Sequence, residues 1–187
     1  ALVLTLIWGY NQYTLSGQLN TALTNNYQRL FFDVKKHVEN VQVSLSKALV
    51  SESSDQNVLL LSRIMNESYF AQDKLSQLPI SHADVAKTEK FLTQVADYSY
   101  SLMKNHLDGE ELTSKQRETL FNLQKGSAGF NAELEALHDK MIGTDFNIGV
   151  ITGKGTKKIG KSKENMLQTS LTTLEKEMGK SPELIYD

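Results

Sequence analysis

Hydrophobic residues recur every three or four positions along most of the chain, which is the spacing of one face of an α-helix. The first regular stripe predicts a helix that begins in or near the apolar amino-terminal segment and runs to about Val50. The polar cluster 51–55 then favours a turn. The stripe consists of Tyr27, Leu30, Val34, Val38, Val41, Leu45 and Ala48.

A second helix is predicted over about residues 55–77, and Pro79 closes it because proline cannot continue a helix. A third begins after Ser81, whose spacing from Asp84 approximates a capping box, and ends near Gly109. The expected stripe of the second helix is Val58, Leu61, Met65, Tyr69 or Ala71, Leu75 and Leu78. That of the third is Val85, Phe91, Leu92, Val95, Tyr98 and Leu102.

A fourth helix is predicted after Thr113, which forms a capping box with Gln116. Gly126 and Gly129 lie inside its pattern, where each costs up to about 1 kcal/mol relative to alanine. They permit either a close helix approach or a bend, and the pattern does not decide between these. The stripe is Leu120, Leu123, Ser127, Phe130, Leu134, Leu137 and Met141.

Four helices joined by short turns predict an all-α protein, because short links make sequential helices antiparallel neighbours. We therefore expect residues 20–142 to form an antiparallel up-down-up-down four-helix bundle. Residues 143–163 are rich in glycine and lysine and predict a flexible basic segment, with contact to anionic lipid or an acidic partner as an alternative. Residues 164–187 predict an additional fifth helix and the lead-in to a further domain.

The amino-terminal segment is a run of apolar residues, and no charged residue precedes Arg29. Because a spanning helix needs roughly 20 apolar residues, we expect residues 1–19 to hold the outer end of a truncated membrane anchor. The alternative is an apolar helix start that packs on the protein's own core. The residues expected to contact the membrane are Leu2, Val3, Leu4, Leu6, Ile7 and Trp8.

The composition narrows the possible chemistry. A net charge of −2 gives no global attraction to nucleic acid, and the absence of cysteine excludes disulfides and thiolate chemistry. Glu135 and His138 make one ExxH pair, whereas di-iron bundles need two such pairs and two further glutamates. No nucleophile elbow, Walker loop or dinucleotide fingerprint is present. We therefore expect a non-catalytic chain without a cofactor or metal.

Two aromatic pairs bear on partner binding. Phe31 adjoins Phe32, and Tyr98 lies two positions from Tyr100, so the members of a pair cannot all face one narrow stripe. Core packing accounts for most of these residues. A member outside the stripe becomes a candidate contact with a partner protein, since aromatic residues often dominate interfaces.

Several short segments recur in an order that is typical of one family. They are Asn25-Asn-Tyr-Gln-Arg29, Gln77-Leu-Pro79, Lys87-Thr-Glu-Lys-Phe-Leu92, Asp97-Tyr-Ser-Tyr100 and Leu184-Ile-Tyr-Asp187. The set resembles the N-terminal region of the spore-germination YpeB family. In that family a similar first segment follows an uncleaved anchor, and a similar last segment precedes C-terminal PepSY repeats, which we expect in the full-length protein.

The resemblance implies a non-enzymatic protein at the outer face of the inner spore membrane. It implies that the protein works with the cortex-lytic enzyme SleB and that each depends on the other for its presence in the spore. An extracytoplasmic sensor bundle of a chemoreceptor or kinase is the alternative. A sensor needs a second membrane helix, and the segment after Met141 is interrupted by glycine and lysine.

Overall fold

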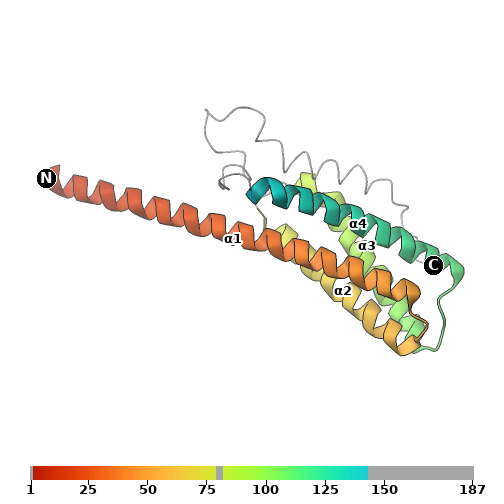
Figure 1. The fold of residues 1–187 in the computed structure, drawn as a ribbon. Coiled ribbons are helices and arrows are strands. Elements are labelled where there is room, and N and C mark those ends of the chain that lie inside the picture. Colours follow the sequence, from red (N-terminus) through yellow and green to blue (C-terminus); the bar gives the residue numbers. More distant parts are fainter. Residues whose placement is uncertain (1, 79–81, 143–187) are drawn as a thin grey trace.

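A computed structural model describes residues 2–78 and 82–142, which form four helices and no strand. The helices are α1 (Leu2–Val50), α2 (Ser54–Ser76), α3 (His82–Leu107) and α4 (Ser114–Ile142). The second half of α1 lies alongside α2 and α4, and the first half projects away from the other helices (Figure 1). The predictions for Pro79–Ser81 and for residues 143–187 lie outside the described residues.

The turns form where the local sequence offers hydrogen-bonding side chains. The Ser53 hydroxyl accepts from the backbone N–H of Gln56 and caps α2. Thr113 and Gln116 exchange two hydrogen bonds of 2.8 and 3.2 Å, which confirms the predicted capping box of α4. Gly109 has a φ of 86°, a left-handed conformation that suits glycine after the end of α3.

Side-chain pairs give the relative order of the helices. Between α1 and α4, Ser46 contacts Gln124, Gln42 contacts Asn131 and Lys35 contacts Glu135. Residue numbers therefore rise along α4 as they fall along α1. Between α1 and α2, His37 contacts Glu67 at 2.6 Å, and between α2 and α3 Tyr69 contacts Asp97 at 2.7 Å.

The core lies along the second half of α1. Every predicted stripe residue of α1 from Leu30 to Ala48 is buried, Phe31 is buried with them, and Tyr27 is half-buried. The core residues shared by the four helices have heptad-like spacing, with steps of three and four. In α4 the buried set is Leu120, Leu123, Ser127, Phe130 and Leu134.

The stripe predicted for α2 was partly wrong. Val58 and Met65 are only half-buried, whereas Asn57 and Ser68 are buried in their place. Of the two alternatives at the middle of the helix, Ala71 is buried and Tyr69 is exposed. The sequence prediction favoured large apolar residues, but the regular spacing selects the positions, and two of these carry polar side chains. The buried positions are 57, 60, 61, 64, 68, 71, 75 and 78.

The two glycines of α4 have different surroundings. A Cβ added at Gly126 would lie 3.0 Å from two ring carbons of Phe91, whereas one added at Gly129 would meet nothing within 4 Å. Gly126 therefore permits a close approach of the Phe91 ring of α3 to the backbone of α4. This answers, for Gly126, the question that the sequence left open.

Candidate partner-binding surface

The first predicted aromatic pair is divided between core and surface. Phe31 is 3% exposed and packs in the core, whereas Phe32 is 43% exposed. Adjacent residues of a helix point about 100° apart, so only one of them can face the narrow core. Their rings meet edge to face with centroids 6.0 Å apart, so the buried Phe31 ring packs against the ring of Phe32. Within this pair, Phe32 alone offers its ring to a partner.

Charged and aromatic groups of α1 and α4 surround Phe32. The His138 ring lies edge-on to it with a centroid distance of 5.3 Å. One turn earlier on α4, Glu135 accepts a 2.5 Å salt bridge from the Lys35 ammonium. The hydrogen bond from Lys35 holds the pKa of the Glu135 carboxyl below its usual value. The surface thus combines one exposed apolar ring with charges that are already paired.

The same turn of α4 holds the groups that most resemble a metal site in the described part of the chain. Ligand atoms of Glu135, His138 and Asp139 lie within 4.8 Å of one another. Glu135 is already paired with the Lys35 ammonium. A metal ion bound to Glu135 would have to displace this ammonium group or lie close to its positive charge. All three donors come from adjacent turns of one helix, with no carboxylate from another helix among them. The predicted absence of a metal stays a prediction.

The second predicted pair is divided in a similar way. Tyr98 is half-buried, and burial raises the pKa of its phenol while a hydrogen bond with Thr119 opposes the shift. Tyr100 is 48% exposed, and the Lys104 ammonium lies 5.9 Å from the centre of its ring. A cation over an aromatic face is attracted by the ring quadrupole. Tyr100 therefore presents an aromatic surface with a positive charge beside it.

Other surface aromatics were not singled out from the sequence as contacts. Phe70 is 53% exposed and lies 5.5 Å from the His37 ring, whose Nδ1 contacts Glu67. Phe121 is 51% exposed with Lys125 5.8 Å from its ring centre. In both the Phe121 and the Tyr100 pairs the lysine lies four positions after the aromatic residue, which places the two side chains on one face of the helix.

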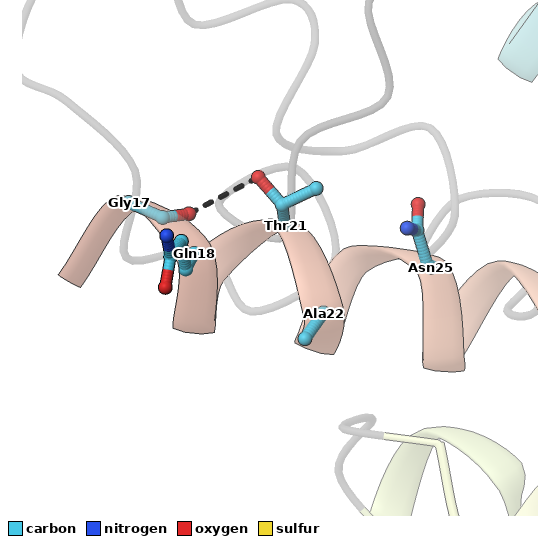
Figure 2. A pocket seen from close by; sticks show the side chains of 5 residues that line it. All are labelled: Gly17, Gln18, Thr21, Ala22 and Asn25. Carbon is cyan, nitrogen blue, oxygen red and sulfur yellow. Dashed lines mark hydrogen bonds between the residues drawn. The ribbon is translucent and has the colours of Figure 1, made fainter. Parts of the chain in front are cut away.

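A shallow hollow lies on the projecting half of α1 (Figure 2). It is lined by uncharged residues, and the Thr21 hydroxyl donates a 3.0 Å hydrogen bond to the carbonyl oxygen of Gly17. That hydroxyl is thus used within its own helix, and none of the described residues that line the hollow is an acid or a base. Its residues are Gly17, Gln18, Thr21, Ala22 and Asn25.

The predicted membrane-contacting residues belong to α1. The backbone of Leu2, Val3, Leu4, Leu6, Ile7 and Trp8 is helical, and their side chains lie outside the described residues. Across the described helices, none is both long and apolar enough to cross a membrane. The boundary predicted between residues 19 and 20 falls inside α1, which continues through it without a break. The anchor and the division into domains both stay predictions.

The core itself contains polar groups. Ser68, Thr88, Ser99 and Ser127 are buried, and their hydroxyl oxygens have no hydrogen-bond partner among the described residues. His106 is 6% exposed, and neither ring nitrogen has such a partner. A buried polar group without a partner costs about 1–3 kcal/mol. These groups come from α2, α3 and α4, whereas α1 contributes the buried Ser44.

These features describe a helical-bundle protein whose exposed aromatic rings are suited to protein contacts. Comparison with known proteins places the chain more closely. The family described as YpeB N-terminal matches residues 16–149, from the projecting half of α1 to just beyond the end of α4. The match covers more than half of the chain, and the chain therefore belongs to this family.

Three curated relatives are each named "Sporulation protein YpeB". The Halalkalibacterium halodurans protein is 28% identical over 120 residues, which is 64% of this chain and 27% of the relative. The Oceanobacillus iheyensis protein is 25% identical over 134 residues, or 72% and 30% of the two chains. The Bacillus subtilis protein is 24% identical over 184 residues, or 96% and 40%. No solved structure matches the chain significantly.

The chain thus spans between 27% and 40% of the length of these relatives. The family resemblance predicted from the short ordered segments is confirmed by the match to the YpeB N-terminal description. The roles predicted for Phe31, Phe32, Tyr98 and Tyr100 in partner binding are not tested by these comparisons and stay predictions.

Proposed function

We propose that this chain is a non-catalytic module of a spore-germination protein that binds and stabilises a cortex-lytic enzyme resembling SleB. Membership of the YpeB N-terminal family is the observation that carries the proposal, together with relatives described as sporulation proteins. In this proposal the four helices form an antiparallel up-down-up-down bundle. The order of side-chain pairs between α1 and α4 supports that arrangement.

The proposal includes a location at the outer face of the inner spore membrane. There the amino-terminal part of α1 is the end of a membrane anchor, and a C-terminal PepSY domain follows the chain. The apolar run from Leu2 to Trp8 and the absence of charge before Arg29 support the anchor. Fractionation of cells that express the protein with its native flanking sequence tests it. Release from membranes by high salt alone would contradict an anchor.

Phe32 and Tyr100 are the proposed contact residues. Both rings are nearly half exposed, and each has a neighbour that orients it: His138 beside Phe32 and Lys104 over Tyr100. Truncation of an aromatic anchor at the centre of an interface typically weakens binding by about 2 kcal/mol or more. Phe31 is buried, so its change to alanine would test core packing and not contact with a partner.

Alanine variants of Phe32 and Tyr100 test the proposal. In spores that carry either alanine variant, immunoblots should show loss of the cortex-lytic enzyme. Circular dichroism of the purified variant chain should show an unchanged melting temperature. Phe121→Ala is a matched control, because Phe121 is about half exposed, like Phe32 and Tyr100, and also has a lysine four positions later. Normal enzyme levels in spores of the Phe32 and Tyr100 double variant would reject these residues as the docking surface.

A binding measurement separates the contact residues from the wider proposal. Purified full-length protein and the cortex-lytic enzyme should co-elute in size-exclusion chromatography, and the double variant should not co-elute. If the unaltered proteins fail to associate under any salt condition and the enzyme persists in spores lacking this protein, the proposed function itself is wrong.

A further inference from the structure

The four helices pack in the order α3, α2, α1, α4, so α3 and α4 each have one close neighbour (Figure 1). Where α3 and α4 face each other, their backbones stay farther apart and side chains join them. The Phe91 ring lies against Gly126, and Tyr98 shares a hydrogen bond with Thr119. The bundle is therefore packed closely at three helix interfaces and less closely at the fourth.

The contacts between α1 and α4 that lie near the surface are polar. A polar contact of this kind adds little stability, because both side chains bond to water when the helix moves away. The buried apolar residues therefore supply most of the attachment of α4 to α1. The polar contacts are Ser46 with Gln124, Gln42 with Asn131, and Lys35 with Glu135.

Two glycines weaken α4 from within. Gly126 and Gly129 lie in the middle of α4, whereas α3 contains no glycine between His82 and Leu107. Glycine destabilises a helix interior because its backbone loses more conformational freedom than that of any other residue. An isolated helix is already marginal in water. The helical form of α4 therefore depends on its packing against α1 more than that of a glycine-free helix would.

The connection between α3 and α4 is suited to act as a hinge. Residues 108–113 join the two helices, and all of them except the half-buried Leu112 are exposed. Gly109 within this connection has a left-handed backbone. By contrast, residues 51–53 alone join α1 to α2, and Ser51 is buried there. A movement of α4 about residues 108–113 would therefore disturb little buried structure.

We propose that α4 is a detachable helix, which leaves α1 as a unit while α1, α2 and α3 stay folded together. Opening separates His138 from Phe32 and Glu135 from Lys35. The surface around Phe32 is thus assembled only while α4 is docked. This consequence for partner binding rests on the proposed function, whereas the opening is a property of the chain alone.

Native-state hydrogen exchange of the full 187-residue chain in low concentrations of urea tests the opening. Amides of a unit that opens together become exposed in the same event. We expect residues 118–134 of α4 to exchange at least a hundredfold faster than residues 34–48 of α1 and 91–102 of α3. Equal protection of α4 and α1 would overturn the proposal. Exchange of α3 as fast as that of α4 would also overturn it, because the two helices would then open together.

The absence of cysteine allows α4 to be fastened to α1 at a chosen place. Gln42→Cys and Asn131→Cys replace two side chains that bond across the α1–α4 interface at 3.0 Å, and a short bismaleimide joins the two thiols. The linked chain should exchange residues 118–134 at least tenfold more slowly than the same variant capped with N-ethylmaleimide. Equal rates in the linked and capped chains would contradict the detachment of α4.

A link between α2 and α3 is the matched control. Tyr69→Cys and Asp97→Cys replace another contact between helices, of 2.7 Å, and leave α4 free. This link should leave exchange of residues 118–134 unchanged. If it slows that exchange as much as the α1–α4 link does, α4 does not open as a separate unit. Ser46→Cys with Gln124→Cys provides a second α1–α4 link if the capped form of the first pair does not fold.

Binding of the cortex-lytic enzyme tests the consequence for the surface around Phe32. Full-length protein with the α1–α4 link should co-elute with the enzyme at least as fully as the capped protein, because the link holds His138 beside Phe32. Loss of co-elution on linking would assign the enzyme to the open form and overturn this part of the proposal. If the enzyme binds neither the linked nor the unaltered protein, the proposed function fails, and the exchange measurements still decide whether α4 opens.

Discussion

The two halves of α1 have the same backbone conformation and different surroundings. From Leu30 to Ala48 its core face is buried against α2 and α4, whereas the described side chains between Tyr13 and Leu23 are exposed. Most helix stability in proteins comes from packing of an apolar face, because an isolated helix is marginal in water. The second half is therefore held by its neighbours, and the first half continues a helix that is already nucleated.

Proline substitutions in the two halves of α1 should give the largest difference in unfolding free energy. Asn40→Pro removes a hydrogen bond inside the packed half and should cost about 3 kcal/mol or more. Asn20→Pro should interrupt only the projecting half and leave the unfolding free energy of the bundle unchanged. Urea denaturation followed by circular dichroism measures both. Equal losses for the two variants would show that the projecting half stabilises the bundle.

The packed half can be examined at single side chains. Leu45 is fully buried and Val43, two positions away, is 45% exposed. Leu45→Ala should lower the unfolding free energy by about 2–5 kcal/mol because it leaves a cavity. Val43→Ala should change it by less than about 0.5 kcal/mol. Similar values for the two in chemical denaturation would mean that α1 faces the core differently.

The polar core positions of the other helices predict an opposite effect. Ser99 is fully buried and its hydroxyl has no partner among the described residues. Ser99→Ala removes that hydroxyl and should raise the unfolding free energy by about 1 kcal/mol. Ser101→Ala, at an exposed position of the same helix, serves as the control. A loss of stability in Ser99→Ala would reveal a hydrogen bond to a group outside the described residues.

Glycine substitutions distinguish packed from bare helix surface with a smaller effect. Gly126→Ala brings a methyl group to 3.0 Å from the buried Phe91 ring and should destabilise the bundle by up to about 1 kcal/mol. Gly129→Ala meets open space and should stabilise by about 0.5–1 kcal/mol through helix propensity. Thermal denaturation of both variants gives the sign. A gain for Gly126→Ala would show that the ring shifts freely.

The smallest effect concerns the ion pair where α4 meets the last packed turns of α1. The pKa of Glu135 is lowered below its ordinary value of 4.5, chiefly by the hydrogen bond from Lys35. A carboxyl group whose pKa is lower in the folded state stabilises the protein at any pH above its unfolded-state pKa. That stability is lost as the pH falls through the folded-state pKa. In Lys35→Met the Glu135 pKa, followed by carboxyl NMR, should return toward 4.5. An unchanged pKa would contradict the assigned cause.

Sequence pattern predicted the four helices because each has a regular apolar stripe and clear end signals. The capping box of Thr113 and the left-handed Gly109 were predicted correctly for the same reason. The stripe of α2 was harder, since its regular spacing passes through Asn57 and Ser68 while larger apolar residues lie beside it. A stripe chosen from the sequence favours large apolar side chains, whereas the position of a residue around the helix determines whether it is buried.

The surface was less predictable than the core. Adjacency alone indicated that Phe31 and Phe32 must separate, but which of them faces the core depends on the exact position of α1 against its neighbours. The Tyr69–Asp97 and His37–Glu67 contacts join helices at residues 28 and 30 positions apart, and nothing local to either residue signals them. Such contacts require the packed arrangement to be known.

The unbroken course of α1 fixes an angular phase between its two halves. The helix has no proline from Leu2 to Val50, and each residue turns the helix by about 100°. Deleting one residue between Leu23 and Leu30 would turn the exposed Leu15, Leu19 and Leu23 by that angle relative to the bundle and shift them by about 1.5 Å. A rigid rod of this kind transmits twist as well as displacement. A rotation imposed on the projecting half therefore reaches Val34 and Val38 as torque on the bundle.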